Sequence, residues 1–494
     1  MLVFAALLAS SGTSHAATQE PCDIYAAGGT PCVAAHSTTR ALYAAYDGPL
    51  YQVQRSSDDT TLNIGVLGAG GYADAAAQDS FCSGTTCVIT VIYDQSGRGN
   101  NLTQAPAGTQ SGGPDTLANA TAAPTTLNGH EAYGVYVAPG TGYRDDTTSG
   151  IATGDEPEGE YAVLDGTHYN AGCCFDYGNA ETGNDDTGDG HMEAIYFGDN
   201  IHWSYGAGSG PWIEADLENG LYAGATKNYD ADNQSVNDRY LTAMVKGTAN
   251  QWSIRGGSAQ SGALSTFYSG VRPAGYNPMH KEGAILLGIG GDNSKSSTGT
   301  FYEGVMTSGY PSDATENAVQ ANITSVGYGA PSPGADLLTP GSRITLQATT
   351  ACCTTDYLRH DDTDTKVVIS PVSATSSATD QADATWIVHA GLADSTCVSF
   401  ESANDPSQYL RHDHFELYIA PNDGTTLFAQ DATFCPQTGH NGQGYSFHSD
   451  NYPTKYLRHY DYTLYIASNG GTNAWDSATL WTDDTSWLIS QPWT

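Results

Sequence analysis

The sequence predicts an all-β protein, an N-terminal β-sandwich followed by a C-terminal β-trefoil, on three observations. The 494 residues include 57 Gly, 31 Tyr, 8 Trp and 11 Phe but only 14% charged residues, a balance typical of β-rich globular proteins and unlike disordered chains. Short β-type runs separated by turn signals fill residues 19–335. A motif recurs three times within residues 336–494.

The first of these regions, residues 19–335, reads as a two-sheet sandwich. Residues 88–93 and 284–289 are apolar, β-branched runs that predict strands, and Asp47-Gly48 and Asn128-Gly129 predict tight turns. We expect no helix of confident length before residue 330. The segment 329–342 then carries three Pro and three Gly, which disfavour regular structure and predict a linker between domains.

The repeat after the linker indicates threefold symmetry. Tyr-Leu-Arg-His occupies residues 357–360, 409–412 and 456–459, and an acidic residue followed by an aromatic one lies downstream of each copy, at Asp383, Asp431 and Asp484. Three such copies of short β-type runs in about 155 residues fit a β-trefoil, whereas a three-bladed propeller does not fit this length.

The charge balance excludes some partners. The chain has 17 Lys and Arg against 54 Asp and Glu, for a net charge of −37, so it lacks the basic footprint of a nucleic-acid binder and would be repelled by an anionic membrane.

Residues 1–18 read as a secretory signal peptide with an apolar core and a small-x-small cleavage site at Ser14-His15-Ala16; the alternative is a disordered N-terminus. No later stretch reaches the roughly 18 apolar residues of a membrane span. We therefore expect a secreted, extracellular, monomeric protein.

The ten cysteines agree with an oxidising compartment. Most lie close together in sequence: Cys22 and Cys32, Cys82 and Cys87, Cys173 and Cys174, Cys352 and Cys353, Cys397 and Cys435. Adjacent Cα atoms lie about 3.8 Å apart across a trans peptide, so a bridge within Cys173-Cys174 would be a strained feature of the kind found at functional surfaces; separate thiols or bridges to other cysteines are the alternative. Cys352-Cys353 could form the same kind of bridge.

Neither a CxxC pattern nor neighbouring His indicates a metal, and we expect no cofactor. Four sequons permit glycosylation, although such triplets also arise by chance: Asn101, Asn119, Asn233 and Asn322.

An acidic, aromatic-rich, secreted protein suits neutral sugars, and glycoside hydrolysis needs two carboxyl groups. In an extended strand, Glu214, Asp216 and Glu218 would share one face. Asp292 follows an apolar strand and a Gly turn. The alternatives are a solvated face for the first group and an Asx turn for the second.

Other candidates carry less weight. Asp176 and Glu193 are favoured as ordinary buried, hydrogen-bonded acids, and His191 as a structural histidine because it lacks neighbouring His or Cys. The G-x-S-x-G form that a serine hydrolase would need does not occur around Ser209.

Long motifs also carry a family resemblance. The segments 22–55, 92–106, 153–183, 288–294 and 299–313 resemble the fungal α-L-arabinofuranosidases of glycoside hydrolase family 54, and the region after 336 resembles carbohydrate-binding module family 42, which binds arabinose. The resemblance implies a catalytic β-sandwich, a β-trefoil, and release of terminal arabinofuranosyl groups from arabinoxylan and arabinan with retention of configuration.

The same resemblance assigns roles to residues of this chain. It implies that Glu218 is the nucleophile and Asp292 the acid/base, and that Asp216, Asn219, Gly291 and Trp203 line the arabinose pocket against a disulfide between Cys173 and Cys174. In the trefoil it implies sugar sites at His412 with Asp431 and at His459 with Asp484; a third site at His360 with Asp383 is a hypothesis. The alternative for these His residues is hydrogen bonding inside the trefoil.

The sequence thus predicts a secreted, retaining, exo-acting α-L-arabinofuranosidase whose partners are arabinose-containing plant cell-wall polysaccharides. Retention would place the two carboxyls roughly 5–5.5 Å apart, and an inverting enzyme roughly 6.5–9.5 Å. The main alternative is a secreted arabinan-binding lectin whose sandwich does not catalyse.

Overall fold

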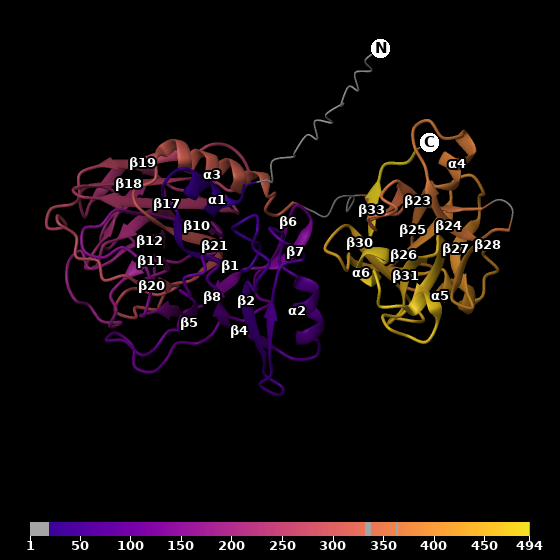
Figure 1. Cartoon of the computed structure of the whole chain (residues 1–494), viewed down its shortest axis with the longest axis horizontal. Coiled ribbons are helices and arrows are strands. Elements are labelled where there is room, and N and C mark those ends of the chain that lie inside the picture. Colours follow the sequence, from indigo (N-terminus) through magenta and orange to yellow (C-terminus); the bar gives the residue numbers. More distant parts are fainter. Residues whose placement is uncertain (1–18, 331–336, 362–363, 494) are drawn as a thin grey trace, which may run out of the picture.

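A computed structural model describes residues 19–330, 337–361 and 364–493. The chain forms two lobes, the N-terminal one in indigo to salmon and the C-terminal one in orange to yellow (Figure 1). The predicted signal peptide and most of the predicted linker, residues 331–336, lie outside the described residues. None of the described helices is long and apolar enough to span a membrane.

The N-terminal lobe is the expected sandwich of two antiparallel sheets. Its first sheet contains, in order, β1 (Cys32–Ser37), β21 (Gly299–Ser308), β10 (Glu158–Leu164), β17 (Leu241–Thr248), β18 (Gln251–Ser258) and β19 (Ser265–Gly270), with β8 (Val135–Val137) beside β21. Its second sheet contains β15 (Leu221–Tyr222), β14 (Trp212–Asp216), β12 (Glu193–Gly198), β11 (Asp176–Ala180), β20 (Ala284–Leu287), β9 (Tyr143–Asp145), β5 (Leu102–Gln104), β4 (Cys87–Ile92), β2 (Tyr51–Arg55) and β3 (Thr61–Ile64). Side chains from both sheets, among them Ile213 and Val245, form one buried core.

The strand predictions hold with small shifts, and one of the two turn predictions is confirmed, whereas Asp47-Gly48 forms no hydrogen-bonded turn. The run 88–93 forms β4 (Cys87–Ile92), and the run 284–289 forms β20, which ends two residues early at Leu287. Asn128 and Gly129 both have positive φ, 48° and 85°, and join β6 (Pro124–Leu127) to β7 (His130–Tyr133) as a tight hairpin. A second small pair, β13 (Tyr205–Ala207) with β16 (Tyr229–Gln234), is parallel.

The expectation of no confident helix before residue 330 is wrong. α3 (Asp313–Ser325) has 13 residues and begins at Ser312, whose hydroxyl accepts a hydrogen bond from the Thr315 amide. Its apolar stripe is narrow, since the helix also buries Glu316, which pairs with Lys246 and Arg255. This mixed polarity explains why the hydrophobic pattern did not reveal the helix. Two shorter helices are α1 (Pro21–Ala27) and α2 (Ala75–Cys82).

The C-terminal lobe has three copies of a four-strand unit. The first copy contains β22 (Arg343–Ala348), β23 (Asp356–His360), β24 (Val367–Pro371) and β25 (Trp386–Ala390). The second contains β26 (Val398–Ser402), β27 (Gln408–Asp413), β28 (Glu416–Pro421) and β29 (Phe434–Thr438), and the third β30 (Tyr445–Ser449), β31 (Tyr456–Tyr460), β32 (Thr463–Ala467) and β33 (Trp487–Ser490).

The pairing of these strands has the topology of a β-trefoil. The first and last strands of the copies pair around a closed ring, because β22 contacts both β25 and β33. The middle two strands of each copy form a hairpin. A short helix ends each time on the acidic residue that the sequence repeat identified: α4 (Ala378–Asp383), α5 (Thr426–Asp431) and α6 (Trp481–Asp484). A 3-10 turn, η2 (Ala474–Asp476), precedes α6.

All ten cysteines are paired, as expected for an oxidising compartment. The five disulfides are Cys22–Cys32, Cys82–Cys87, Cys173–Cys174, Cys352–Cys353 and Cys397–Cys435. Both vicinal bridges therefore form. The peptide bond between Cys173 and Cys174 is cis, not trans as the sequence argument assumed, and their Cα atoms lie 2.9 Å apart.

The structure contradicts one of the four glycosylation predictions. Asn233 is fully buried, and its Nδ2 donates to the carbonyls of Ile213 and Ala223. A glycan replaces one of the two hydrogens on that nitrogen, so at least one of these bonds would be lost, and the fully buried side chain leaves no room for a sugar. Asn119 is exposed, whereas Asn101 and Asn322 are half-buried.

Candidate active site

A small pocket is lined by residues of three connections of the second sheet, those that precede β11, follow β14 and follow β20. Its volume is about 90 Å³. Every residue that the sequence analysis placed in the catalytic pocket lines it: Cys173, Cys174, Trp203, Asp216, Glu218, Asn219, Gly291 and Asp292. The predicted nucleophile and the predicted acid/base therefore share one cavity.

Glu218 reaches the pocket from a turn, not from an extended strand. β14 ends at Asp216, and Glu218 and Asn219 have positive φ angles of 63° and 56°. The Glu218 amide donates to Asp216 Oδ1 at 3.0 Å, and the Tyr276 hydroxyl donates to the Glu218 carbonyl at 2.8 Å. The prediction of three acids on one strand face is thus wrong for Glu218.

Glu214 lies on β14 behind this site. Its side chain is fully buried and accepts a hydrogen bond from the Ser204 hydroxyl at 3.2 Å, and it does not line the pocket. Burial raises the pKa of Glu214 well above its usual range.

Asp292 lies in the turn that follows β20. Its Oδ1 accepts hydrogen bonds from the Ser294 amide at 2.9 Å and from the Ser294 hydroxyl at 2.6 Å, which is an Asx turn. The same side chain is half-exposed and lines the pocket. The Asx-turn interpretation of Asp292 is confirmed, and the turn fixes a carboxyl group that lines the cavity, so the acid/base role of Asp292 stays a prediction.

Gly291 brings the backbone close to two carboxyl groups. A Cβ at this position would overlap Glu181 Oε2 and would lie 2.8 Å from Glu218 Oε2. Arg144 Nη1 donates to the Gly291 carbonyl at 3.2 Å, and Arg144 Nη2 donates to the Glu181 carbonyl. A glycine is thus required where the two glutamate side chains converge.

Glu181 is a site residue that the sequence analysis missed. It follows the last residue of β11 directly and is fully buried. The available signal was its position directly after a central strand that begins with Asp176, since acids on and beside a central strand are unusual in a core. Asp176 itself, favoured as an ordinary buried acid, is buried and does not line the pocket, although the charge of Asp216 acts on it.

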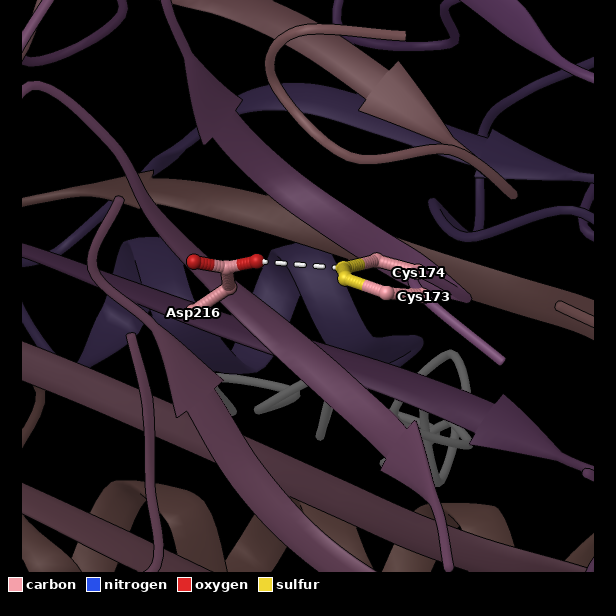
Figure 2. A group of neighbouring side chains, drawn as sticks. All are labelled: Cys173, Cys174 and Asp216. Atoms are coloured by element: carbon pink, nitrogen blue, oxygen red, sulfur yellow. Dashed lines mark hydrogen bonds between the residues drawn. A yellow bond between two sulfur atoms is a disulfide. The ribbon is translucent and has the colours of Figure 1, made fainter. Parts of the chain in front are cut away.

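The vicinal disulfide forms one wall of the pocket. Figure 2 shows Cys173, Cys174 and Asp216 side by side, with Cys174 Sγ 3.4 Å from Asp216 Oδ2. Trp203 packs against the two cysteines, and the Cys174 amide donates to the Ser294 carbonyl at 3.1 Å. Although this trio is compact enough to surround a cation, the sulfurs are bonded to each other and offer no thiolate, so the group does not fit a metal site.

Burial raises the pKa values of the acids around this pocket, whose described lining includes no Lys or Arg. Burial raises the pKa of Asp216 to about 7, and the charges of Glu181 and Asp292 add to the rise. Burial and the neighbouring Asp216 raise the pKa of Asp176 well above its usual range. Burial and the neighbouring Glu181 carboxyl group raise the pKa of Glu218. We treat Glu181 and Glu218 as a pair that shares a proton.

Two other predictions are confirmed outside the pocket. Glu193 is a structural acid, because Arg272 donates to both its oxygens at 2.9 and 2.8 Å and Lys281 lies 3.2 Å away. Burial opposes its ionisation, but these cations lower the pKa of Glu193 to about 2. His191 pairs with Glu282 at 2.8 Å, as a structural histidine would.

The three trefoil copies place their motif residues alike. The Arg of each Tyr-Leu-Arg-His motif pairs with the downstream Asp: Arg359 with Asp383 at 2.8 Å, Arg411 with Asp431 at 2.7 Å, and Arg458 with Asp484 at 2.8 Å. The neighbouring His Nε2 lies near the other carboxylate oxygen in each copy, with distances of 3.5 Å for His360, 3.4 Å for His412 and 3.6 Å for His459. The first copy thus has the same geometry as the other two.

Family models match both lobes. The model described as "Alpha-L-arabinofuranosidase B, catalytic" matches residues 21–329, and the model described as "Alpha-L-arabinofuranosidase B (ABFB) domain" matches residues 346–489. The chain belongs to the α-L-arabinofuranosidase B family. Its sequence resemblance is therefore confirmed over nearly the whole length.

Relatives in the α-L-arabinofuranosidase B family match from end to end. The chain is 62% identical to "Probable alpha-L-arabinofuranosidase B" of Aspergillus terreus, over 97% of this chain and 96% of that protein. It is 61% identical to "Alpha-L-arabinofuranosidase B" of Aspergillus oryzae, over 95% and 94%. A crystal structure of an arabinofuranosidase complexed with arabinofuranosyl-α-1,2-xylobiose matches with a TM-score of 0.62 and 57% identity, over 96% of this chain and 100% of that one.

Proposed function

We propose that this glycoside hydrolase is a retaining, exo-acting α-L-arabinofuranosidase that removes terminal arabinofuranosyl groups from arabinoxylan and arabinan. The observation that carries the proposal is the single pocket that Glu218, Asp292, Trp203 and the Cys173–Cys174 disulfide line together. The pocket of about 90 Å³ suits one small sugar ring better than a run of a polymer, which supports exo action.

The proposed chemistry is double displacement. Ionised Glu218 attacks the anomeric carbon, and the bond to the leaving oxygen breaks as Asp292 gives that oxygen its proton. Asp292 then takes a proton from water, whose oxygen displaces Glu218 and releases the sugar. The half-exposed Asp292 is suited to this exchange because water reaches it.

The buried acids around Glu218 have a separate role. Glu218 must lose its share of the common proton before it can attack, and Glu181 is the neighbour that can keep this proton and donate a hydrogen bond to ionised Glu218. Asp216, with a pKa of about 7, is protonated at acidic pH and can donate a hydrogen bond to a sugar hydroxyl beside the disulfide.

The test is Glu218→Gln, with Glu214→Gln as the matched control, because Glu214 is also buried but lies outside the pocket. We expect Glu218→Gln to lose at least about 10³-fold in kcat on 4-nitrophenyl α-L-arabinofuranoside with an unchanged Tm, and the control to keep its activity. Undiminished turnover by Glu218→Gln would contradict the proposal.

The configuration of the first product distinguishes retention from inversion. We expect proton NMR of the early reaction to show α-arabinofuranose first; β-arabinofuranose as the first product would establish the inverting alternative. The lectin alternative predicts binding without any hydrolysis by the native chain.

The trefoil is proposed to hold the enzyme on arabinose-containing plant cell-wall polysaccharides. The support is the threefold Arg, His and Asp arrangement, the matching domain model, and the arabinofuranosyl-xylobiose that a related structure contains. We also propose that the chain is a secreted monomer; its five disulfides support an extracellular location. Activity confined to the cell interior would contradict secretion.

A further inference from the structure

The third trefoil copy has a cavity of about 360 Å³ around His459 and Asp484. Thr350 connects these two side chains, since its Oγ1 lies 2.8 Å from His459 Nε2 and donates to Asp484 Oδ1 at 2.9 Å. Arg458 fixes the other oxygen of Asp484. The floor of the cavity is therefore a connected polar group suited to sugar hydroxyls.

The wall beside this floor is the second vicinal disulfide. Both Cys352 and Cys353 line the cavity. Cys353 is 4% exposed and belongs to the trefoil core, whereas Cys352 is exposed to solvent. The bridge thus anchors an exposed sulfur at the rim of the cavity. Two more apolar side chains lie at the rim, Leu480 and Tyr462, which are 54% and 57% exposed.

At the site of the second copy, the equivalent segment comes from the third copy, between β30 and β31, and carries an aromatic residue in place of a disulfide. There Asn451 connects His412 to Asp431 as Thr350 connects His459 to Asp484, and the next residue is Tyr452. The Tyr452 ring contacts the His412 ring edge-on, with centroids 5.5 Å apart. Aromatic rings commonly provide the apolar surface of a sugar site.

At the site of the third copy the equivalent segment comes from the first copy, between β22 and β23, and contains the cysteines. Tyr456 follows Asn451 by five positions, whereas Tyr357 follows Thr350 by seven, and Ala351-Cys352-Cys353 lies in the longer connection. This site thus has no aromatic side chain at the place of Tyr452, and the disulfide occupies the same stretch.

The catalytic pocket shows the same combination of groups. There too a vicinal disulfide lies beside a buried aspartate, Asp216, in a small cavity. A disulfide is apolar and polarisable and donates no hydrogen bond, so it suits the C–H face of a furanose, while the carboxylate takes the hydroxyls.

We propose that the Cys352–Cys353 disulfide is the apolar wall of a site for a terminal furanosyl group in the third trefoil copy, with His459 and Asp484 as its hydroxyl-binding groups. This inference rests on the proposed sugar binding of the trefoil. It assigns a binding role to a disulfide that would otherwise only stabilise the fold.

The first test uses ligand protection. The Glu218→Gln variant is briefly treated with a phosphine reductant and then alkylated, once with and once without arabinofuranosyl-α-1,2-xylobiose. The labelling of each cysteine is measured by mass spectrometry. We expect ligand to slow labelling of Cys352 and Cys353 at least about fivefold and to leave Cys397 unchanged, because the Cys397–Cys435 bridge lies outside the cavity.

The catalytic disulfide makes the outcomes distinguishable. Protection of Cys173 and Cys174 without protection of Cys352 would overturn the inference and leave the enzyme function intact. Protection of neither bridge would contradict sugar binding in both pockets, and so the proposed function as well.

The second test compares Cys352→Ser/Cys353→Ser with Cys397→Ser/Cys435→Ser, which also removes one trefoil bridge. Titration calorimetry with the same oligosaccharide should show about 5–10-fold weaker binding at the third copy for the first variant alone. The loss should disappear in a His459→Ala background, because that change removes the site itself. Equal affinity in the two variants would overturn the inference; if the first does not fold, the protection experiment on the intact bridge decides.

Discussion

The Oε2 atoms of Glu181 and Glu218 converge on the same backbone position, Gly291, in the floor of the catalytic pocket. The two acids come from different strands of one sheet, Glu181 after β11 and Glu218 after β14. Both are buried, and the nearby Glu181 carboxyl group adds to the burial that raises the pKa of Glu218. The protonation of the proposed nucleophile is therefore coupled to a neighbour that the family resemblance did not assign.

Replacement of Glu181 should change the pH profile more than the fold. In Glu181→Gln the neighbouring negative charge is gone but a donor remains, so the pKa of Glu218 should fall and the acidic limb of kcat/KM should move to lower pH by about one unit. Glu181→Ala should lose about 10–100-fold in kcat because no donor positions Glu218. An unshifted pH profile in Glu181→Gln would assign Glu181 a structural role only.

Replacement of Asp292 should depend on the leaving group. In Asp292→Asn no proton is available for the departing oxygen, so hydrolysis of an arabinofuranosyl-xylose linkage should fall by at least about 10²-fold. Attack on 4-nitrophenyl α-L-arabinofuranoside should suffer less, since nitrophenolate leaves without a proton. Equal losses on both substrates, measured as pre-steady-state rates, would argue against an acid role.

Asp216 should make the fold less stable as the pH rises. Its pKa is about 7 in the folded chain and about 4 in an unfolded one, so the folded state binds more protons between these values. The free energy of unfolding should therefore fall from about pH 4 to pH 7, by on the order of a few kcal/mol. Asp216→Asn should flatten this part of the profile in denaturant titrations; an unchanged slope would contradict the assignment.

Many residues of the site could be predicted from the sequence because they lie within long local motifs. The Gly-rich turn before Asp292 and the acidic run through Glu218 lie in single short segments, and the repeated Tyr-Leu-Arg-His motif fixed the threefold domain. The contacts between distant segments could not be predicted from the sequence. The positive φ of Glu218 turns it off the strand, and the approach of Glu181 to Gly291 joins residues 110 positions apart. Asn233 looked like a glycosylation site because a sequon does not report burial.

The sequence did not predict the helix α3 or the role of the second vicinal disulfide, because both depend on contacts between residues far apart in the chain. α3 buries Glu316 in ion pairs with two distant cations, which masks its apolar face. Cys352 and Cys353 gain their position beside His459 and Asp484 only because the first and last strands of the trefoil pair, as β22 does with β33.

Covalent labelling of the nucleophile tests the central claim most directly. A cyclic sulfate with the arabinofuranose configuration carries an electrophilic carbon at the anomeric position, and the crystals of a related arabinofuranosidase were soaked with a cyclic sulfate inhibitor. Peptide mapping of the treated chain should find one added sugar, attached to Glu218, and Asp292 unmodified. An adduct on Asp292 or on Asp216, with Glu218 unlabelled, would contradict the account.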